Sequence, residues 1–362
     1  MLLPIPGRAP VDRYFMLPPP DSGQRPTEFI TFGAHSYGEI NLEISKEAPI
    51  NVFVGRFSSI ATGFNVYIGL NHLYKNAVTT YPFDDKSIYY EFASYGKNFL
   101  QYEIPRSRKL DNQYQTIIGN DVWIGRCATV IGGVKIGSGA IIGSNSVVAK
   151  DIPPYAIAVG NPARIVKYRF NEEQIKKFMA IKWWNWDIDK ICANVHKMYD
   201  VEKFLAEHYK PEIENVHEDD IGKEVEKYRE SGHKVYTFIA DFRSPYPVWR
   251  RVLRGLYSSK VQNAVMLFFM GLGVTDKDVN ELKNFPSTIE KITANPIVKC
   301  IAPVNGKIFS EYALKNSDFF ITTREMITSE CIDLLYNTDV KILSSLNDGI
   351  FEGEPLVDWS KV

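Results

Sequence analysis

The sequence predicts a three-sided parallel β-helix in the first half of the chain and an α/β domain in the second half. Two observations predict the β-helix: a six-residue repeat that begins at Ile118, and the same register at Val54, Ile60 and Val66. A third predicts the α/β domain: beyond residue 233, strand-like runs alternate with helical ones. A chain of 362 residues is long enough for two such domains.

The repeat reads IGNDVW, IGRCAT, VIGGVK, IGSGAI, IGSNSV, VAKDIP. Neither the helical period of 3.6 nor strand alternation produces this spacing. Three hexads would close one triangular coil, and the coils would stack through parallel ladders about 4.8 Å apart. Two places in each hexad are expected to be buried. The first place is aliphatic (Ile118, Ile124, Val130, Ile136, Ile142, Val148), and the fifth is uncharged and mostly small (Val122, Ala128, Val134, Ala140, Ser146, Ile152).

The early part of the repeat breaks at His72. This residue follows Val66 by six positions, where an aliphatic residue is due, and the hexads resume only at Ile118. Residues 72–117 are therefore expected to form a long excursion from one coil. Long loops inside a compact domain are usually functional.

Helices are predicted to close the β-helix after an apolar exit segment, DIPPYAIAVGNPARIVKYRF. They span residues 171–204, with Asn171 as N-cap and two glutamates in the first turn. Trp183, Trp184 and Trp186 could stack on a sugar, but packing against the prism or a neighbouring subunit is the favoured interpretation.

The second half is predicted to hold a Rossmann-like parallel sheet over residues 233–362. Its strand-like runs are VYTFIA, AVMLFFMG, IVKCIA, FFITT and VKILS. Residues 205–232 would form a linker or helix, so that residues 1–204 make the first domain. After the second run, Gly271-Leu272-Gly273 could meet a phosphate, although a tight turn is favoured. The order of motifs resembles the nucleotide-sugar-binding half of GT-B glycosyltransferases, without room for the partner half.

Composition excludes several classes of protein. A formal net charge of −1 gives no global field to attract nucleic acid. The four cysteines lack metal-ligand spacing, so we expect buried free thiols and no metal. The N-terminus lacks the apolar core of a signal peptide, and the longest apolar stretch is far short of the roughly 20 residues of a membrane span. The expected location is cytoplasmic.

Residues from about 30 to 190 resemble the xenobiotic (virginiamycin and chloramphenicol) branch of the hexapeptide acyltransferases. The resemblance rests on SYG at 36–38, VGRFSSIATGFNV at 54–66, Asn71-His72, TYPF at 80–83, IGNDVWIG, and SVVAKDIPPYAIAVGNPARIVKYRF. It implies a left-handed β-helix, a homotrimer with active sites between subunits, and acetyl-CoA as the acyl donor. The surroundings of TYPF and the second domain depart from the family.

The resemblance also implies the site residues. His72, with Asn71 beside it, falls at the place of the family's catalytic histidine, and an imidazole with a pKa of about 6.5 can act as a general base at neutral pH. The acetyl-CoA groove would be lined by Trp123, Arg126, Ala128, Ser144, Ala149, Lys150 and Arg164. Lys150 and Arg164 would contact phosphates. Tyr37, Tyr81 and Phe83 would contact the acceptor.

Three functions remain open at this point. The leading hypothesis is direct acetyl transfer onto a sugar of a surface polysaccharide or its precursor. Oxygen is favoured over nitrogen as the acceptor atom. The GT-B-like second domain suggests the sugar. The alternatives are O-acetylation of an antibiotic of the chloramphenicol or streptogramin type, and a non-catalytic trimeric scaffold.

Overall fold

The computed structural model describes residues 2–5, 13–17, 28–44, 51–68, 78–79, 115–211, 220–243, 248–271, 273–302, 309–322, 331, 333 and 340–344. The predicted site residues Asn71, His72, Tyr81 and Phe83 lie outside these ranges, as does nearly all of the excursion 72–117.

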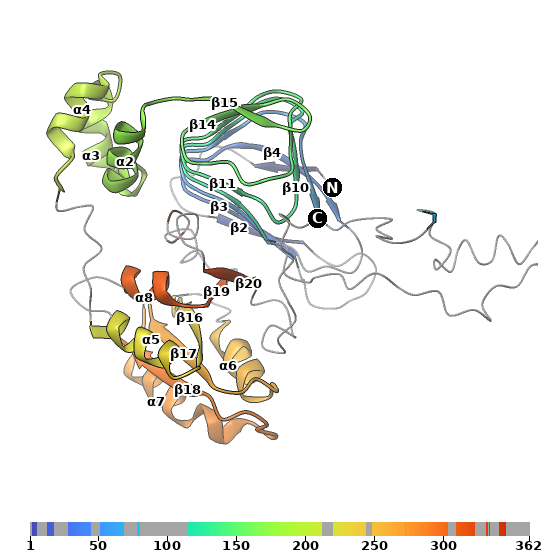
Figure 1. Cartoon of the computed structure of the whole chain (residues 1–362), viewed down its shortest axis with the longest axis vertical. Coiled ribbons are helices and arrows are strands. Elements are labelled where there is room, and N and C mark those ends of the chain that lie inside the picture. The colour runs from blue at the N-terminus through green and yellow to red at the C-terminus, as the bar shows by residue number, and fades with distance from the viewer. Residues whose placement is uncertain are drawn as a thin grey trace, which may run out of the picture.

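The first half of the chain is a prism with three sheet faces (Figure 1). Face A holds β1 (Leu2–Ile5), β4 (Gly38–Ile44), β7 (Phe64–Ile68), β10 (Thr129–Ile131) and β13 (Val147–Val148). Face B holds β2 (Arg13–Leu17), β3 (Glu28–Phe32), β5 (Asn51–Val54), β8 (Gln115–Ile118) and β11 (Lys135–Ile136). Face C holds β6 (Ser59–Ile60), β9 (Trp123–Ile124), β12 (Ile141–Ile142), β14 (Ala156–Val159) and β15 (Arg164–Tyr168).

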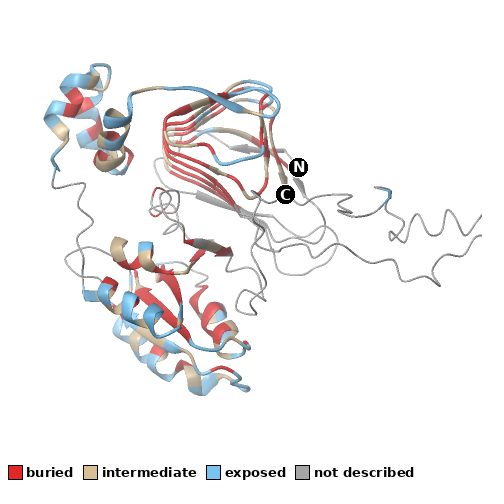
Figure 2. Ribbon diagram, in the orientation of Figure 1, coloured by how far each residue is buried: buried red, intermediate tan, exposed pale blue. Residues whose placement is uncertain are grey.

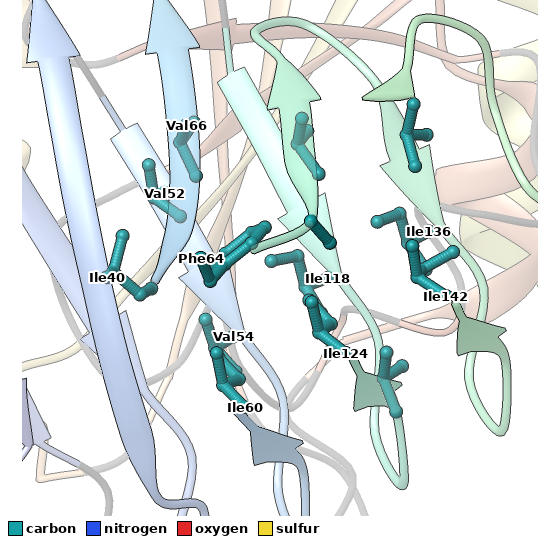
Figure 3. Close-up of a cluster of buried hydrophobic side chains, with 14 of the residues drawn as sticks. Ile40, Val52, Val54, Ile60, Phe64, Val66, Ile118, Ile124, Ile136 and Ile142 are labelled. Atoms are coloured by element: carbon teal, nitrogen blue, oxygen red, sulfur yellow. The ribbon is translucent and has the colours of Figure 1, made fainter. Parts of the chain in front are cut away.

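The predicted hexad core is confirmed. The first-place residues stack in three columns inside the prism: Val54, Ile118 and Ile136 on face B, Ile60, Ile124 and Ile142 on face C, and Val66, Val130 and Val148 on face A. Each is at most 3% exposed, and the fifth-place residues are buried as well. Figure 3 shows side chains from all three columns, including Val54, Ile60 and Val66, pointing into the same interior. Each buried aliphatic side chain contributes about 1.5–3 kcal/mol.

One further coil precedes the predicted repeat. In it β3 pairs in parallel with β5, and β4 with β7, so that Phe32 lies beside Val54 and Leu42 beside Val66. These partners are 22 and 24 residues apart, whereas regular coils repeat after 18, as from Ile118 to Ile136. A search for six-residue spacing therefore misses this coil. Antiparallel strands flank the coils, with β1 on β4, β2 on β3 and β15 on β14.

The closing helices are α2 (Glu172–Ile181), α3 (Ile188–Asn194) and α4 (Val201–His208). Asn171 caps α2 as predicted, in a capping box with Gln174. The Trp183 ring lies 5.0 Å from that of Phe57 in the prism, and Trp184 is 1% exposed. Trp186 stacks on Phe204 of α4. Packing against the prism is confirmed for Trp183, whereas Trp186 packs within the closing helices.

The second half contains a five-stranded parallel sheet in the order β18-β17-β16-β19-β20. The strands are β16 (Lys234–Ala240), β17 (Ala264–Met270), β18 (Ile297–Ile301), β19 (Phe319–Thr322) and β20 (Lys341–Ser344). The helices are α5 (Asp220–Glu230), α6 (Trp249–Tyr257), α7 (Asp276–Asn284) and α8 (Glu311–Asn316). Separate hydrophobic clusters cover the two sides of the sheet, and Figure 2 shows its central strands buried.

The two glycines after β17 fit a tight turn. A Cβ atom at Gly271 would lie 2.2 Å from the Ala240 carbonyl oxygen, and Gly273 has a φ of +81°. Glycine, which lacks a Cβ atom, tolerates the close contact at the first position and the positive φ at the second. The phosphate interpretation and the GT-B resemblance stay predictions.

The expectation of buried cysteines was wrong for three of the four. Cys127, Cys192 and Cys300 are exposed, and Cys331 is buried. Cys127 occupies a prism corner in the left-handed region, with a φ of +56°, and so points outward rather than into the core. Within the described ranges, no helix has the length and apolar character needed to cross a membrane.

Candidate active site

The prism corners decide where each predicted site residue lies. At the corner between faces B and C, a left-handed residue recurs in every coil, at His35, Phe57, Asp121, Gly139 and Tyr155. The corner between faces C and A also contains left-handed residues, at Gly63, Cys127 and Asn145. Both corners are therefore short and regular.

The third corner, between faces A and B, is where the excursion leaves the prism. It joins β7 to β8, whereas the next coil turns there through Gly132 and Gly133. The Gly132 amide donates to the Tyr67 carbonyl at 2.6 Å, so the regular corner lies directly on the interrupted one. Ala149 and Lys150, both exposed, follow β13 at this same corner.

Three of the predicted acetyl-CoA residues gather at the corner between faces C and A. The Asn145 amide donates to the Arg126 carbonyl at 2.9 Å, which stacks the coil of Ser144 on that of Arg126. The Ala163 amide donates to the Val147 carbonyl at 2.8 Å. This hydrogen bond brings the chain just before Arg164 to the same edge. All three side chains are exposed. Neither guanidinium forms an ion pair with another described residue, so both remain available to an anion.

Tyr37 and Trp123 share one outward-facing column on face C. Ser59 pairs with Tyr37 on one side and with Trp123 on the other. Tyr37 is 38% exposed and Trp123 is 56% exposed. Two aromatic side chains thus project from the same face, separated by one coil.

Ala128 requires a correction. Its side chain is fully buried in the prism core, because the fifth place of each hexad points inward. Its side chain therefore packs the interior and does not line a surface groove.

Within one chain, the remaining predicted residues form two separate groups. Tyr37, Trp123, Arg126, Ser144 and Arg164 lie on face C or at its border with face A, whereas Ala149 and Lys150 lie at the corner between faces A and B. In a triangular cross-section, that corner is opposite face C. A single chain therefore does not bring the two groups into one groove.

Face C also exposes apolar side chains on its outer strands. Val159, Ile165, Val166 and Tyr168 are between 39% and 57% exposed. Val159 lies on the outward side of face C, as Trp123 does, whereas Ile165 and Tyr168 pair with the inward-facing Ala158 and Ala156. Exposed apolar side chains such as Trp123 and Val159 are of the kind that marks contacts between proteins.

A buried polar cluster at the corner between faces B and C was missed by the sequence patterns. The Asp333 carboxylate accepts hydrogen bonds from Asn120 Nδ2 at 3.2 Å, from Trp184 Nε1 at 2.8 Å and from Ser138 Oγ. Burial raises the pKa of this carboxyl, although the three donors and Lys182 oppose the shift. Asn120 and Ser138 both occupy the third place of their hexads. This shared position is the sequence feature that could have pointed to the cluster.

A second, partly buried acid, Asp121, follows Asn120 in the chain. Arg169 Nη1 donates to Asp121 Oδ2 at 3.0 Å and to the Gly139 carbonyl at 2.7 Å. Burial raises the pKa of the Asp121 carboxyl despite this guanidinium. The pair fixes the end of β15 to the prism, which is a structural role.

Known proteins resemble part of this chain. Residues 115–150 match the family model described as bacterial transferase hexapeptide (six repeats). A protein of Lysinibacillus sphaericus named "Probable macrolide acetyltransferase" is 39% identical over 145 residues, covering 40% of this chain and 74% of that protein. A chloramphenicol acetyltransferase of Klebsiella aerogenes is 39% identical over 146 residues, covering 39% of this chain and 63% of that enzyme.

Solved structures align only weakly. An N-acyltransferase from Bacillus cereus, solved with dTDP and 3-hydroxybutyryl-CoA, gives a TM-score of 0.28 at 22% identity, over 44% of this chain and 73% of that one. The identity with the macrolide acetyltransferase over most of its length, together with the stacked hexads, shows that this chain belongs to the hexapeptide-repeat acetyltransferases related to the chloramphenicol and macrolide enzymes.

Proposed function

We propose that this chain transfers an acetyl group from acetyl-CoA to a hydroxyl of a sugar in a surface polysaccharide or its precursor. The observation that carries the acetyl transfer is the family membership of the prism. The sugar rests on the α/β sheet of the second half and its resemblance to a sugar-nucleotide-binding fold. The relatives match 39–40% of this chain.

The described residues fit a coenzyme A ligand. Arg126 and Arg164 offer two guanidinium groups at one exposed edge, with the small Ser144 beside them, and Lys150 is a further exposed cation. Charge-assisted hydrogen bonds to phosphates suit these groups. Trp123 offers a flat exposed ring on the adjoining face.

The division of the site residues into two groups supports an active site between subunits. Face C of one subunit would meet the corner between faces A and B of the next, which carries Lys150 and the excursion with His72. The exposed apolar residues of face C would then be covered by the neighbour. A homotrimer closes such a heterologous contact into a ring.

His72 is proposed as the general base. Acetyl-CoA supplies the thioester. The His72 imidazole would take the proton of the acceptor hydroxyl as its oxygen attacks the thioester carbonyl carbon. The carbon–sulfur bond then breaks, and the coenzyme A thiolate takes up the proton from the imidazolium. No acyl-enzyme is formed on the chain, and positioning of both substrates supplies much of the rate.

Antibiotic O-acetylation is the second candidate, because relatives that match 39–40% of this chain carry the names of chloramphenicol and macrolide acetyltransferases. Thiol release from acetyl-CoA, measured with glycans, sugar nucleotides, chloramphenicol and a streptogramin, separates the candidates. Turnover with a sugar acceptor supports the proposal, and turnover with an antibiotic alone supports the second. Binding of neither coenzyme A nor any acceptor would instead indicate a scaffold. The cytoplasmic location stays a prediction.

A further inference from the structure

A cavity of about 320 Å³ lies between the corner of faces B and C and the closing helices. The prism corner contributes Asp121 and Tyr155, and Arg169 follows the end of β15. The closing helices contribute aromatic and aliphatic side chains, including Phe178 of α2 and the exposed Tyr199. The volume is at the lower end of the range of about 300–1,000 Å³ that small-molecule sites occupy. The cavity shares no residue with the groups assigned above to acetyl-CoA or to the acceptor.

The Tyr155 hydroxyl indicates that the cavity holds a ligand. Tyr155 is 2% exposed, and its hydroxyl has no hydrogen-bond partner in the part of the chain that the structure describes. Burial raises the pKa of Tyr155 well above its ordinary value, so the hydroxyl keeps its proton and remains a donor. A buried donor without an acceptor costs free energy, and such groups are rare in native proteins. An acceptor atom of a ligand would be the partner that this hydroxyl lacks.

The pair of Asp121 and Arg169 also leaves hydrogen-bonding groups unused. Arg169 bonds to Asp121 Oδ2 and to the Gly139 carbonyl through Nη1 alone. Its Nε and Nη2 donate to none of the described residues, and Asp121 Oδ1 accepts from none of them. Both side chains are 27% exposed, so they can be reached from solvent. The guanidinium carbon lies 5.2 Å from the centre of the Tyr155 ring, which places these polar groups at one end of the cavity.

This mixture of groups favours a neutral ligand that both donates and accepts hydrogen bonds. An anion would face the Asp121 carboxylate, and a cation would face the Arg169 guanidinium. A purely apolar ligand would leave both charged groups and the Tyr155 hydroxyl without partners. A hydroxyl group donates and accepts at once, so a polyol ring can bond to Asp121 and to Arg169 together. The ring of Tyr199, which is 89% exposed, offers a flat surface for the C–H face of such a ring.

We propose that this cavity binds a neutral sugar unit, with Tyr199 as the stacking surface and with Tyr155, Arg169 and Asp121 as the hydrogen-bonding partners. The site lies outside the residues assigned to acetyl transfer, so the inference does not depend on that activity. Because the Tyr155 hydroxyl bonds to no described residue of the protein, it serves binding and not folding. Removing the hydroxyl should therefore weaken binding of the sugar without a loss of stability.

The test measures binding to the full-length chain by ligand-observed NMR titration, in the absence of acetyl-CoA. The probes are the methyl glycosides of glucose, galactose, mannose and N-acetylglucosamine, with benzamide as a neutral aromatic probe. Tyr155→Phe removes only the hydroxyl, and Tyr199→Ala removes the exposed ring. Tyr168→Ala is the matched control, because it removes a tyrosine that is 44% exposed and does not line the cavity. Asp121 and Arg169 stay unchanged, since their pair also fixes the end of β15.

We expect at least one methyl glycoside to bind the wild type more tightly than benzamide does. Tyr155→Phe should weaken that binding by about 3- to 10-fold, while its urea unfolding midpoint equals or exceeds that of wild type. Tyr199→Ala should weaken it by about 3-fold or more at an unchanged midpoint, and Tyr168→Ala should bind as wild type does. The inference is overturned if no glycoside binds, if benzamide binds more tightly, or if Tyr155→Phe or Tyr199→Ala keeps wild-type affinity. A lowered midpoint in Tyr155→Phe, or an equal loss of binding in Tyr168→Ala, would overturn it as well.

Discussion

Val54 pairs with Ile118 across 64 residues, whereas Ile118 pairs with Ile136 after only 18. The difference of 46 residues equals the length of the range 72–117, so the excursion is an insertion into one coil that leaves the ladder on either side in register. Ile60 with Ile124 and Val66 with Val130 show the same offset. The prism does not need the excursion in order to stack.

Removing the excursion should therefore leave the fold intact and abolish acetyl transfer. Deleting residues 69–114 keeps all of β7 and β8, and Gln115→Gly supplies the residue type found at Gly133 in the regular corner, where φ is +91°. A shorter loop also lowers the entropic penalty of closure. We expect an unchanged far-ultraviolet circular dichroism spectrum, retained coenzyme A binding and no detectable turnover. An unfolded deletion variant would contradict the insertion model.

Neighbouring residues of β9 should differ sharply in their effect on stability. Ile124 is fully buried and Trp123 is 56% exposed. We expect Ile124→Ala to lower the free energy of unfolding by about 2–5 kcal/mol, through lost burial and a cavity. Trp123→Ala should lower it by about 0.5 kcal/mol or less in dilute monomer. Urea unfolding followed by circular dichroism measures both, and equal losses would mean that the inside and outside of the prism are wrongly assigned.

Arg126 should contribute to acetyl-CoA binding through charge. A hydrogen bond to a charged group is worth about 1.5–3 kcal/mol, so Arg126→Ala should raise the KM for acetyl-CoA about 10-fold or more and leave the acceptor KM near wild type. The effect should shrink at high salt. Lys167→Ala, which removes an exposed cation from β15, is the matched control. A similar rise in both variants would point to general electrostatics rather than to a phosphate contact.

Asp333 should make stability depend on pH in a defined direction. Burial raises its pKa above the ordinary value of 3.8. Its contribution to the unfolding free energy is therefore fully present below the unfolded-state pKa and is lost as pH rises through the folded-state pKa. Asp333→Asn cannot titrate, so the stability of wild type relative to this variant should decline as pH increases from about 4. Urea unfolding across a pH series measures the difference, and a relative gain with pH would show a lowered pKa instead.

The interior of the prism was predictable because one period governs it. Burial at the first and fifth places of each hexad follows from the geometry of a three-sided coil, so Ile124 and Val134 could be assigned from sequence alone. The coil containing Phe32 and Leu42 was not predicted, because its residues lie 22 and 24 positions from their partners in the next coil and so break the six-residue period. The Asp333 cluster leaves no periodic signal, since Asn120 and Asp333 are 213 residues apart.

The site was predictable only as a set of residue types. Exposure of Trp123, Arg126 and Lys150 agrees with a role in binding, but their distribution over two sides of the prism could not be read from hexad order. Ala128 was misassigned because the same small residue suits both a groove and a buried corner. Distinguishing the two requires the inward direction of the fifth place, which the repeat itself carries.

His72 should be needed for chemistry and not for binding of the donor. Loss of a general base lowers turnover by about 10²–10⁴, so His72→Ala should reduce kcat by at least about 10² while the affinity for coenzyme A stays within about 2-fold. His196→Ala removes an exposed histidine from the closing helices and serves as the control, with wild-type turnover expected. Single-turnover kinetics and isothermal titration with desulfo-coenzyme A separate the two effects. Because the prism packs without the excursion, the unfolding midpoint of His72→Ala should equal that of wild type. Near-wild-type kcat in His72→Ala would show that another residue is the general base, and would leave the assignment of the groove intact.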